Sequence, residues 1–238
     1  MPEKTIRKFT HLTSRRIALP VLLTIGLFLI AIFYVFLPQI EQSFISQKKE
    51  MIQELTETVW SLLGNYRERE MSGELTRAEA QRRAVLRIGK LRYGKEQKDY
   101  FWITDRHPRM IVHPYRPDLN GTDLTDFHDS AGKKVFVEFV RAVSGTGESY
   151  VDYMWQWNDD STRIVPKLSY VRLFEPWGWV IGTGIYIEDV KTEIRKLEMK
   201  AILLTLAILF AAAWPLHAQM DQPLELSCSN SQVAKAEV

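Results

Sequence analysis

The stretch ESYVDYMWQWNDDSTRIVPKLSYVRLFEPWGWVIGTGIY, residues 148–186, decides the fold. Aromatic and β-branched residues dominate three runs within it, a composition typical of β-strands. Asn-Asp-Asp at 158–160 and Glu-Pro at 175–176 separate the runs, and both are typical turn sequences. The stretch therefore predicts an antiparallel meander with strands at residues 149–157, 166–174 and 177–186. Gly182 and Gly184 in the last run are expected to serve the fold and not a ligand.

Two more strands and a helix are expected upstream of the meander. Residues 100–104 form a short aromatic and β-branched run that ends at Asp-Arg-His-Pro, and residues 109–113 have the pattern of its hairpin partner. The apolar residues of 133–143 recur at helical spacing, so this segment is expected to form a helix.

Two helices are expected before the first hairpin. Residues 40–69 carry apolar residues at spacings of three, four or seven, which places these residues on one helical stripe: Ile40, Phe44, Met51, Leu55, Val59, Leu62 and Tyr66. A second helix is expected to begin with a capping box formed by Thr76 and Glu79, and to end at Tyr93-Gly94 with a glycine C-cap. Together the elements predict an α+β domain with one sheet whose face is covered by helices.

Apolar segments flank this domain on both sides. Residues 17–37 carry no charge and are long enough to cross the ~30 Å hydrocarbon core of a bilayer. A cleaved signal peptide is the alternative, but its apolar core usually has only ~7–15 residues before a small-residue cleavage site. Residues 201–219 contain a second, shorter apolar run. The sequence therefore predicts two transmembrane helices around the domain.

The charges before the first apolar segment predict the orientation in the membrane. The basic residues there are Lys4, Arg7, Lys8, Arg15 and Arg16, against the single acid Glu3. Positive charge stays on the cytoplasmic side of a membrane. We therefore expect residues 1–16 and 220–238 in the cytoplasm and residues 38–200 outside it, in the periplasm or the extracellular space.

The composition excludes several classes of function. The net charge of +2 does not favour a nucleic-acid partner, which usually requires a strong basic excess on one face. The single cysteine, Cys228, excludes a disulfide framework and a cysteine-rich metal site. The spacing of His107, His113 and His128 matches no compact metal site. We expect no metal and no cofactor.

The segments that predict the sheet resemble the single-Cache sensor domain (sCache, Cache type 2), over about residues 40–195. The resemblance rests on five segments in the order of the family: DYFWITD (99–105), RMIVHPYRPDLNG (109–121), ESYVDYMWQW (148–157), VPKLSYVRLF (165–174) and WGWVIGTGIYIEDV (177–190). It implies a PAS-like five-stranded antiparallel sheet behind a long N-terminal helix. It also implies an extracytoplasmic location at the inner membrane, in bacterial histidine kinases or chemoreceptors.

The resemblance further implies a ligand of the class of acetate, pyruvate, lactate and propionate. Residues 221–238 are too few for a kinase or a methyl-accepting module. We therefore expect either a fragment of a longer receptor or a cytoplasmic output module supplied by a partner protein.

Two polar residues are expected to bind the ligand. His113 ends the second predicted strand, where its imidazole can face a pocket, although a lone histidine more often has a structural role. The resemblance favours the ligand, because a histidine at this strand end belongs to the motif of the family. Lys167 lies in an otherwise apolar strand, where a cation is costly unless it is paired. A ligand carboxylate is one such partner, and an edge lysine that prevents aggregation is the alternative.

Four aromatic residues complete the predicted ligand site: Trp102, Tyr153, Trp155 and Tyr170. Buried tyrosine and tryptophan need partners for their polar atoms, which a small pocket provides, although core packing explains most aromatics at strand spacing. Tyr153 and Trp155 are two residues apart and share a face of the sheet. Lys167 and Tyr170 are three apart, so they join one site only through a bulge or a ligand reached from the edge.

These observations predict a membrane-anchored sensor that binds a small carboxylate and has no catalytic activity of its own. No nucleophile–base set is visible in the sequence. We expect a homodimer through the helix at 40–66. Two alternatives remain open: an adaptor that binds a periplasmic protein, and a hydrolase that uses His113 and Asp129.

Overall fold

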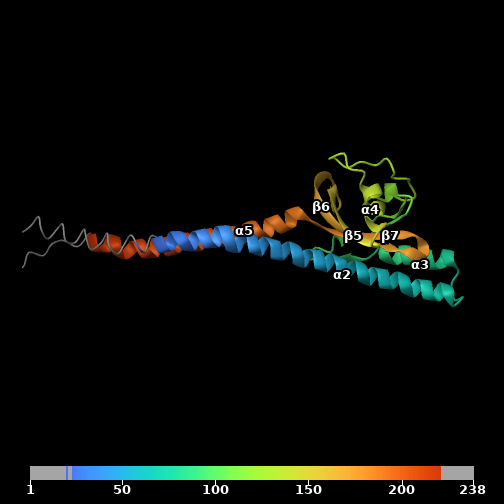
Figure 1. Cartoon of the computed structure of the whole chain (residues 1–238), viewed down its shortest axis with the longest axis horizontal. Helices are drawn as coiled ribbons and strands as arrows, with labels where there is room; N and C mark the ends of the chain where they lie inside the picture. The colour runs from blue at the N-terminus through green and yellow to red at the C-terminus, as the bar shows by residue number, and fades with distance from the viewer. Residues whose placement is uncertain (1–19, 21–22, 221–238) are drawn as a thin grey trace, which may run out of the picture. The chain divides into compact units, whose positions relative to one another are not determined.

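The computed structural model describes residue 20 and residues 23–220, with side chains described up to residue 211 (Figure 1). The chain divides into two units, residues 1–194 and 195–238. The first unit contains the α+β domain. The described part of the second unit is the continuation of helix α5 (Ile187–Met220), which begins in the first unit.

The domain is organised around a five-stranded antiparallel sheet with the spatial order β4-β3-β7-β6-β5. The strands are β3 (Trp102–Asp105), β4 (Met110–Val112), β5 (Glu148–Trp157), β6 (Asp160–Phe174) and β7 (Trp179–Tyr186). Strands β5 to β7 are the predicted meander, and β3 with β4 is the predicted hairpin. The predicted α+β fold, with its antiparallel sheet and long N-terminal helix, is confirmed.

Three strand boundaries differ from the sequence prediction by two residues or more. Strand β3 begins at Trp102 and not at residue 100, because Tyr100 pairs with Arg92 outside the five-stranded sheet. Strand β6 begins at Asp160 and not at residue 166, because Asn158 adopts a φ of 46° and closes a tight turn in which Trp157 pairs with Asp160. Strand β7 begins two residues later than predicted. Glu175–Trp177 form the 3-10 turn η3, and Gly178 follows in the left-handed region with a φ of 67°.

Helices cover both faces of the sheet (Figure 1). Helices α2 (Leu37–Met71) and α3 (Arg77–Ile88) pack on one face, where they bury apolar side chains against Phe101, Ile103 and Ile181. Helix α4 (Val135–Val143) packs on the opposite face together with the loop that contains the 3-10 turn η2 (Pro117–Leu119). The sheet therefore has two buried faces, and a pocket can form on either one.

Helix α2 belongs to a helical run that extends from residue 23 to residue 71 and includes the π-helical turn η1 (Ile32–Phe36). Its fully buried line is Ile52, Thr56, Val59 and Leu63. Of the predicted stripe only Val59 belongs to this line, and Ile40 is 37% exposed. Apolar residues occupy neighbouring positions along this helix, so spacing alone did not separate the buried line from its flanks.

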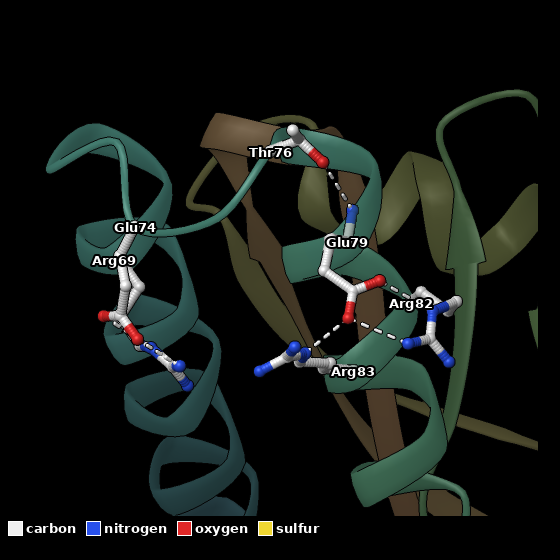
Figure 2. Close-up of polar contacts among 6 residues, drawn as sticks. All are labelled: Arg69, Glu74, Thr76, Glu79, Arg82 and Arg83. Carbon is white, nitrogen blue, oxygen red and sulfur yellow. Dashed lines mark hydrogen bonds and ion pairs between the residues drawn. The ribbon is translucent and has the colours of Figure 1, made fainter.

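The turn between α2 and α3 contains half of the predicted capping box (Figure 2). The Thr76 hydroxyl accepts a hydrogen bond from the backbone N–H of Glu79 at 3.3 Å. The Glu79 carboxylate does not reach back to Thr76 and instead accepts hydrogen bonds from Arg82 and Arg83. These arginines lower the pKa of Glu79 to about 2. The reciprocal half of the box was wrong, because the two arginines on the next turn compete for the carboxylate.

The predicted end of the second helix was also wrong. Helix α3 ends at Ile88, five residues before Tyr93. The chain then forms a two-stranded hairpin of β1 (Arg92–Tyr93) and β2 (Asp99–Tyr100). Gly94 has a φ of 78°, but it serves this hairpin turn and not a helix C-cap.

The part of the chain that the structure describes contains one helix that is long and apolar enough to cross a membrane. This helix is Leu23–Met71, whose most apolar 18-residue window has a mean hydropathy of 2.2. The first predicted span, residues 17–37, overlaps its beginning, and residues 17–19, 21 and 22 lie outside the described residues. The second predicted span, residues 201–219, is helical, but its side chains are described only up to residue 211. Both spans stay predictions.

Two glycines in β7 allow close packing on the two neighbouring strands. A Cβ atom at Gly182 would lie 2.2 Å from the Trp102 ring, and one at Gly184 would lie 2.2 Å from the Ser169 hydroxyl oxygen. Both distances are far shorter than any van der Waals contact. The absence of a side chain at Gly182 therefore fixes the position of Trp102.

We expect Gly182→Ala to reduce the free energy of unfolding by about 1–3 kcal/mol, because the added methyl overpacks the Trp102 ring. Gly64→Ala is the matched control. No atom lies within 4 Å of a Cβ at Gly64 in α2, so this change should stabilise the helix by about 0.5–1 kcal/mol. Urea unfolding followed by tryptophan fluorescence measures both effects. Equal stability of Gly182→Ala and the wild type would show that Trp102 is free to shift.

Candidate ligand-binding site

A small internal pocket lies between the sheet and helix α4. Six side chains line it: Trp102 from β3, His113 after β4, Phe136 and Phe139 from α4, and Tyr153 and Trp155 from β5. All six are at most 6% exposed. The space between them totals about 160 Å³ and is narrower than a water molecule throughout. Only a ligand of a few heavy atoms fits here, with small displacements of the surrounding rings.

The alternation of side chains along the strands produces this pocket. Residues two apart on a strand share a face, which brings Tyr153 and Trp155 together on β5. Strand pairing places Lys167 of β6 directly opposite Tyr153 on one side and opposite Tyr186 of β7 on the other. Lys167 therefore points to the same face of the sheet as the pocket-lining aromatics.

Lys167 is buried in the sheet, with 1% of its surface exposed. Its Nζ donates hydrogen bonds to the hydroxyl oxygens of Tyr100 at 2.9 Å and Tyr186 at 3.3 Å. The same nitrogen lies 4.1 Å and 4.6 Å from the centroids of these two rings. Burial lowers the pKa of Lys167 to about 7, and the negative charge of Asp99 acts in the opposite direction. No carboxylate among the described residues forms an ion pair with this lysine.

His113 presents one defined nitrogen to the pocket. Its Nδ1 accepts hydrogen bonds from the backbone N–H groups of Arg116 at 3.0 Å and Tyr115 at 3.3 Å. Because Nδ1 is an acceptor, the proton of the neutral ring lies on Nε2. Burial, followed by the positive charges of Lys167 and Arg116, holds the pKa of His113 well below its usual value. The ring is therefore neutral and offers an Nε2–H donor.

The aromatic walls differ in how their polar atoms are satisfied. The Tyr153 hydroxyl is hydrogen-bonded to Ser169 at 2.9 Å. The indole N–H of Trp155 is buried near the Tyr100 hydroxyl, but no hydrogen bond of good geometry forms. Trp102 stacks on Phe139 with 4.5 Å between ring centroids. The Trp155 N–H is thus a buried donor without a partner in the described part of the chain.

Tyr170 does not lie with this group, in contrast to the prediction. Strand β6 pairs with β7 without interruption from residue 167 to residue 174, so no bulge reverses the side-chain direction. Tyr170 points to the α2 face, where it packs with Ile52 and Ile185. The other five predicted residues, His113, Lys167, Tyr153, Trp155 and Trp102, lie on the α4 face.

Two tyrosines of the site, Tyr100 and Tyr186, were missing from the predicted set. Tyr100 precedes Trp102 by two residues, so the strand period already placed it on the same face. Tyr186 follows from the β6–β7 turn, because the pairing of Phe174 with Trp179 places Lys167 opposite Tyr186. Both signals were present in the sequence, but the second requires the register of the hairpin.

The hydrolase alternative is not supported by this geometry. The Asp129 carboxylate accepts hydrogen bonds from the backbone N–H groups of Ala131, Lys133 and Met154, so it holds a loop against the edge of β5. His113 Nδ1 is engaged by backbone groups, so the two residues do not form an acid–base pair. Within residues 23–220, no cluster of three or more histidine, cysteine, aspartate or glutamate side chains could hold a metal ion.

A larger cavity, of about 500 Å³ on the same measure, also contacts Trp155. Its lining includes Phe127 and Asp129 from the loop before α4, and Gln156 and Ile164 from the β5–β6 hairpin. Trp155 lines both spaces, and among the lining residues it is the one that they share.

The α+β domain thus combines an antiparallel sheet behind a long helix with a small pocket of buried side chains, and a buried lysine lies on the same face of the sheet. The family profile described as single Cache domain 2 matches residues 44–200, which is more than half of the chain. The chain belongs to this family, and the predicted resemblance is confirmed.

Two relatives show the setting in which such domains occur. The methyl-accepting chemotaxis protein McpP of Pseudomonas putida is 34% identical over 195 residues, covering 82% of this chain and 35% of that protein. The sensor histidine kinase MctS of Rhizobium johnstonii is 32% identical over 150 residues, covering 63% of this chain and 31% of that protein. The chain thus spans about a third of the length of these relatives.

Two solved structures share the fold. A periplasmic sensor domain of a chemotaxis protein is 38% identical with a TM-score of 0.58, over 60% of this chain and 97% of that one. A Cache chemosensory domain described for its recognition of carboxylic acid is 39% identical with a TM-score of 0.58, over 61% of this chain and 97% of that one. The relatives are sensor domains of chemoreceptors and kinases.

We expect the His113 ring to remain neutral, with its proton on Nε2, at about pH 6, where an unperturbed histidine is mostly charged. The physical cause is burial together with two backbone N–H donors at Nδ1. Long-range ¹H–¹⁵N spectra of ¹⁵N-histidine-labelled protein distinguish the two nitrogens. A titration midpoint near 6.5, or a proton on Nδ1, would contradict this arrangement.

Proposed function

We propose that this chain is the membrane-anchored, periplasmic input part of a signalling receptor that binds a small carboxylate in the internal pocket. The observation that carries the proposal is Lys167, a buried cation that has only tyrosine hydroxyls as partners. A buried charge is costly unless it is paired. A ligand carboxylate supplies the missing partner and forms a charge-assisted hydrogen bond.

The neighbouring groups support the same ligand class. The Nε2–H of His113 and the unpaired N–H of Trp155 are donors on the same face as Lys167. A carboxylate has two oxygens and about four acceptor sites, so it can accept from all three groups. The remaining walls are aromatic rings, which suit a short apolar or keto-bearing tail. Acetate, propionate, lactate and pyruvate are therefore the ligands that we propose.

The recognition of carboxylic acid by one relative supports this proposal. The Cache chemosensory domain with 39% identity recognises carboxylic acid. A chemoreceptor and a histidine kinase are both among the relatives. We propose that the signal passes to a cytoplasmic output module of one of these two kinds. That module belongs either to a longer form of this chain or to a partner protein.

The proposed topology has residues 17–37 and 201–219 as membrane helices, with residues 38–200 in the periplasm between them. The apolar side chains near both ends support this topology, because they are exposed on the isolated chain: Leu23, Leu27, Phe28, Ile30, Leu203, Leu204, Leu206 and Phe210. We also propose a homodimer through α2, because this helix is longer than the part of it that packs on the sheet.

Lys167→Met should weaken the binding of the preferred carboxylate roughly 10- to 100-fold, the equivalent of a lost hydrogen bond to a charged group of about 1.5–3 kcal/mol. Methionine keeps most of the side-chain volume, so the fold should persist. Isothermal titration calorimetry of the full chain in detergent, with acetate, propionate, lactate and pyruvate in turn, measures the affinity.

Tyr170→Phe is the matched control for this experiment. It lies three residues further along the same strand, faces α2, and its hydroxyl has no hydrogen-bond partner among the described residues. Its affinity should equal that of the wild type. Unchanged affinity in Lys167→Met would assign the lysine a structural role, and no binding by the wild type would contradict the proposed ligand class.

A reporter enzyme fused after Val238 should lie in the cytoplasm, and one inserted at Gly121 should lie in the periplasm. The basic residues before residue 17 and the second apolar run motivate this expectation. Gly121 is exposed in a turn, so an insertion there should be tolerated. Alkaline phosphatase activity reports the periplasmic side. An active phosphatase at the C-terminus would eliminate the two-span topology.

A further inference from the structure

A neutral and a protonated lysine differ in the number of N–H donors that they offer. A neutral lysine amine has two N–H bonds, and a protonated one has three. The Nζ of Lys167 lies within hydrogen-bond distance of the hydroxyl oxygens of Tyr100 and Tyr186. The Tyr186 hydroxyl uses its own hydrogen for the Gln156 carbonyl oxygen, so toward Lys167 it can only accept. While Lys167 donates to both hydroxyls, a further N–H for a ligand oxygen exists only in the protonated lysine.

The surroundings do not stabilise that third N–H unless an anion is present. Lys167 is 1% exposed, so water does not solvate its charge. The tyrosine rings at 4.1 Å and 4.6 Å give a partial cation–π stabilisation. These neutral groups do not replace the hydration of an ammonium ion, and burial consequently lowers the pKa of Lys167 to about 7.

The titratable groups around Lys167 come from three strands and one loop. They are Asp99 and Tyr100 from β2, His113 after β4, Tyr153 from β5 and Tyr186 from β7. The tyrosines remain neutral, because burial raises the pKa of each one well above 10. His113 remains neutral because its pKa is well below 6.5.

Asp99 is the anion whose charge acts on Lys167, without forming an ion pair with it. Asp99 also interacts with Lys48 of α2 and with Asp189 of α5. Reduced hydration, followed by the charge of Asp99, raises the pKa of Asp189 to about 6. Asp189 is therefore a second group near this cluster whose titration the experiment must distinguish from that of Lys167.

We propose that the pocket binds its carboxylate together with one proton, which Lys167 takes up from solvent when the ligand is bound. The inference rests on the proposed function and adds the proton as a second ligand of the same site. The proton balance is as follows: the neutral Lys167 amine, one proton from solvent and the ligand carboxylate give an ammonium–carboxylate pair. No bond of the ligand is broken. The domain would then report a carboxylate most strongly at neutral or acidic pH.

The sign of the linkage follows from the two states. Above about pH 7 the free site has lost the proton that the complex retains, so the affinity falls by about tenfold per pH unit. The stability of the ligand-free protein changes in the opposite direction. The unfolded chain holds the lysine proton up to about pH 10.5, so stability rises with pH between about 7 and 10.5.

Calorimetry of the full chain in detergent with acetate, and separately with propionate, tests this inference. The titrations are made between about pH 6 and 9 in phosphate and in Tris, whose ionisation enthalpies differ. At about pH 8 we expect close to one proton to be taken up per ligand, and at pH 6 close to none. The affinity should fall by about 10-fold from pH 8 to pH 9.

Variants test whether Lys167 is the group that takes up the proton on ligand binding. Lys167→Arg keeps its charge throughout this range and should remove the pH dependence. Asp99→Asn removes the anion that favours the protonated lysine and should move the loss of affinity to lower pH. Asp189→Asn is the control and should leave the profile above pH 7 unchanged. Where Lys167→Arg does not fold, proton uptake by the wild type decides alone.

The outcomes separate this inference from the proposed function. Carboxylate binding with equal affinity at pH 6 and 9 and no proton uptake would overturn the inference and leave the proposed function intact. The absence of binding at every pH would overturn both.

Discussion

The register between β6 and β7 is the constraint on which the rest of the domain depends. The two strands pair without interruption from Lys167–Tyr186 to Phe174–Trp179. This register places a lysine between tyrosines on the α4 face. The separate pairing of β3 with β7 places Gly182 opposite Trp102, where any side chain would collide with the ring. A slip of one residue would turn every side chain of β6 to the other face and remove the pocket.

The β6–β7 register also holds Lys167 inside the sheet, although burial of its charge destabilises the fold. A buried cation without a counter-ion destabilises a protein, and a loop would adapt to expel it. Lys167 cannot leave, because its strand is hydrogen-bonded on both sides by β5 and β7. The sheet thus keeps this lysine in a place where its protonation is unfavourable unless an anion binds. A preorganised site of this kind loses little conformational entropy on binding.

The sequence predicted the elements of this domain because the turns and the strand period are local signals. Asn158 to Asp160 and the Glu175-Pro176 pair located the meander, and alternation placed Tyr153 with Trp155. Failures occurred where a long-range contact decided the outcome. The competition of two arginines for Glu79 and the β1–β2 pairing that ended α3 early are examples. Tyr170 was placed in the predicted site because its residue type suited a ligand pocket. Its spacing of three residues from Lys167 already indicated the opposite face of the sheet.

The two faces of the sheet suggest how binding and signalling are joined. Lys167 faces the pocket, while its neighbour Leu168 faces α2 and pairs with Ile185 of β7. On that side Ile52 of α2 packs in one cluster with Val190 of α5, Tyr170 of β6 and Ile185 of β7, so both helices contact the back of the strand that carries Lys167. A ligand shifts the arrangement of these helices only through a difference in its affinity for two arrangements. A hundredfold difference corresponds to about 2.7 kcal/mol, which is within what one charge-assisted hydrogen bond to Lys167 supplies. A single ion pair formed on one face of a sheet is therefore sufficient, in energy, to change the packing on the other.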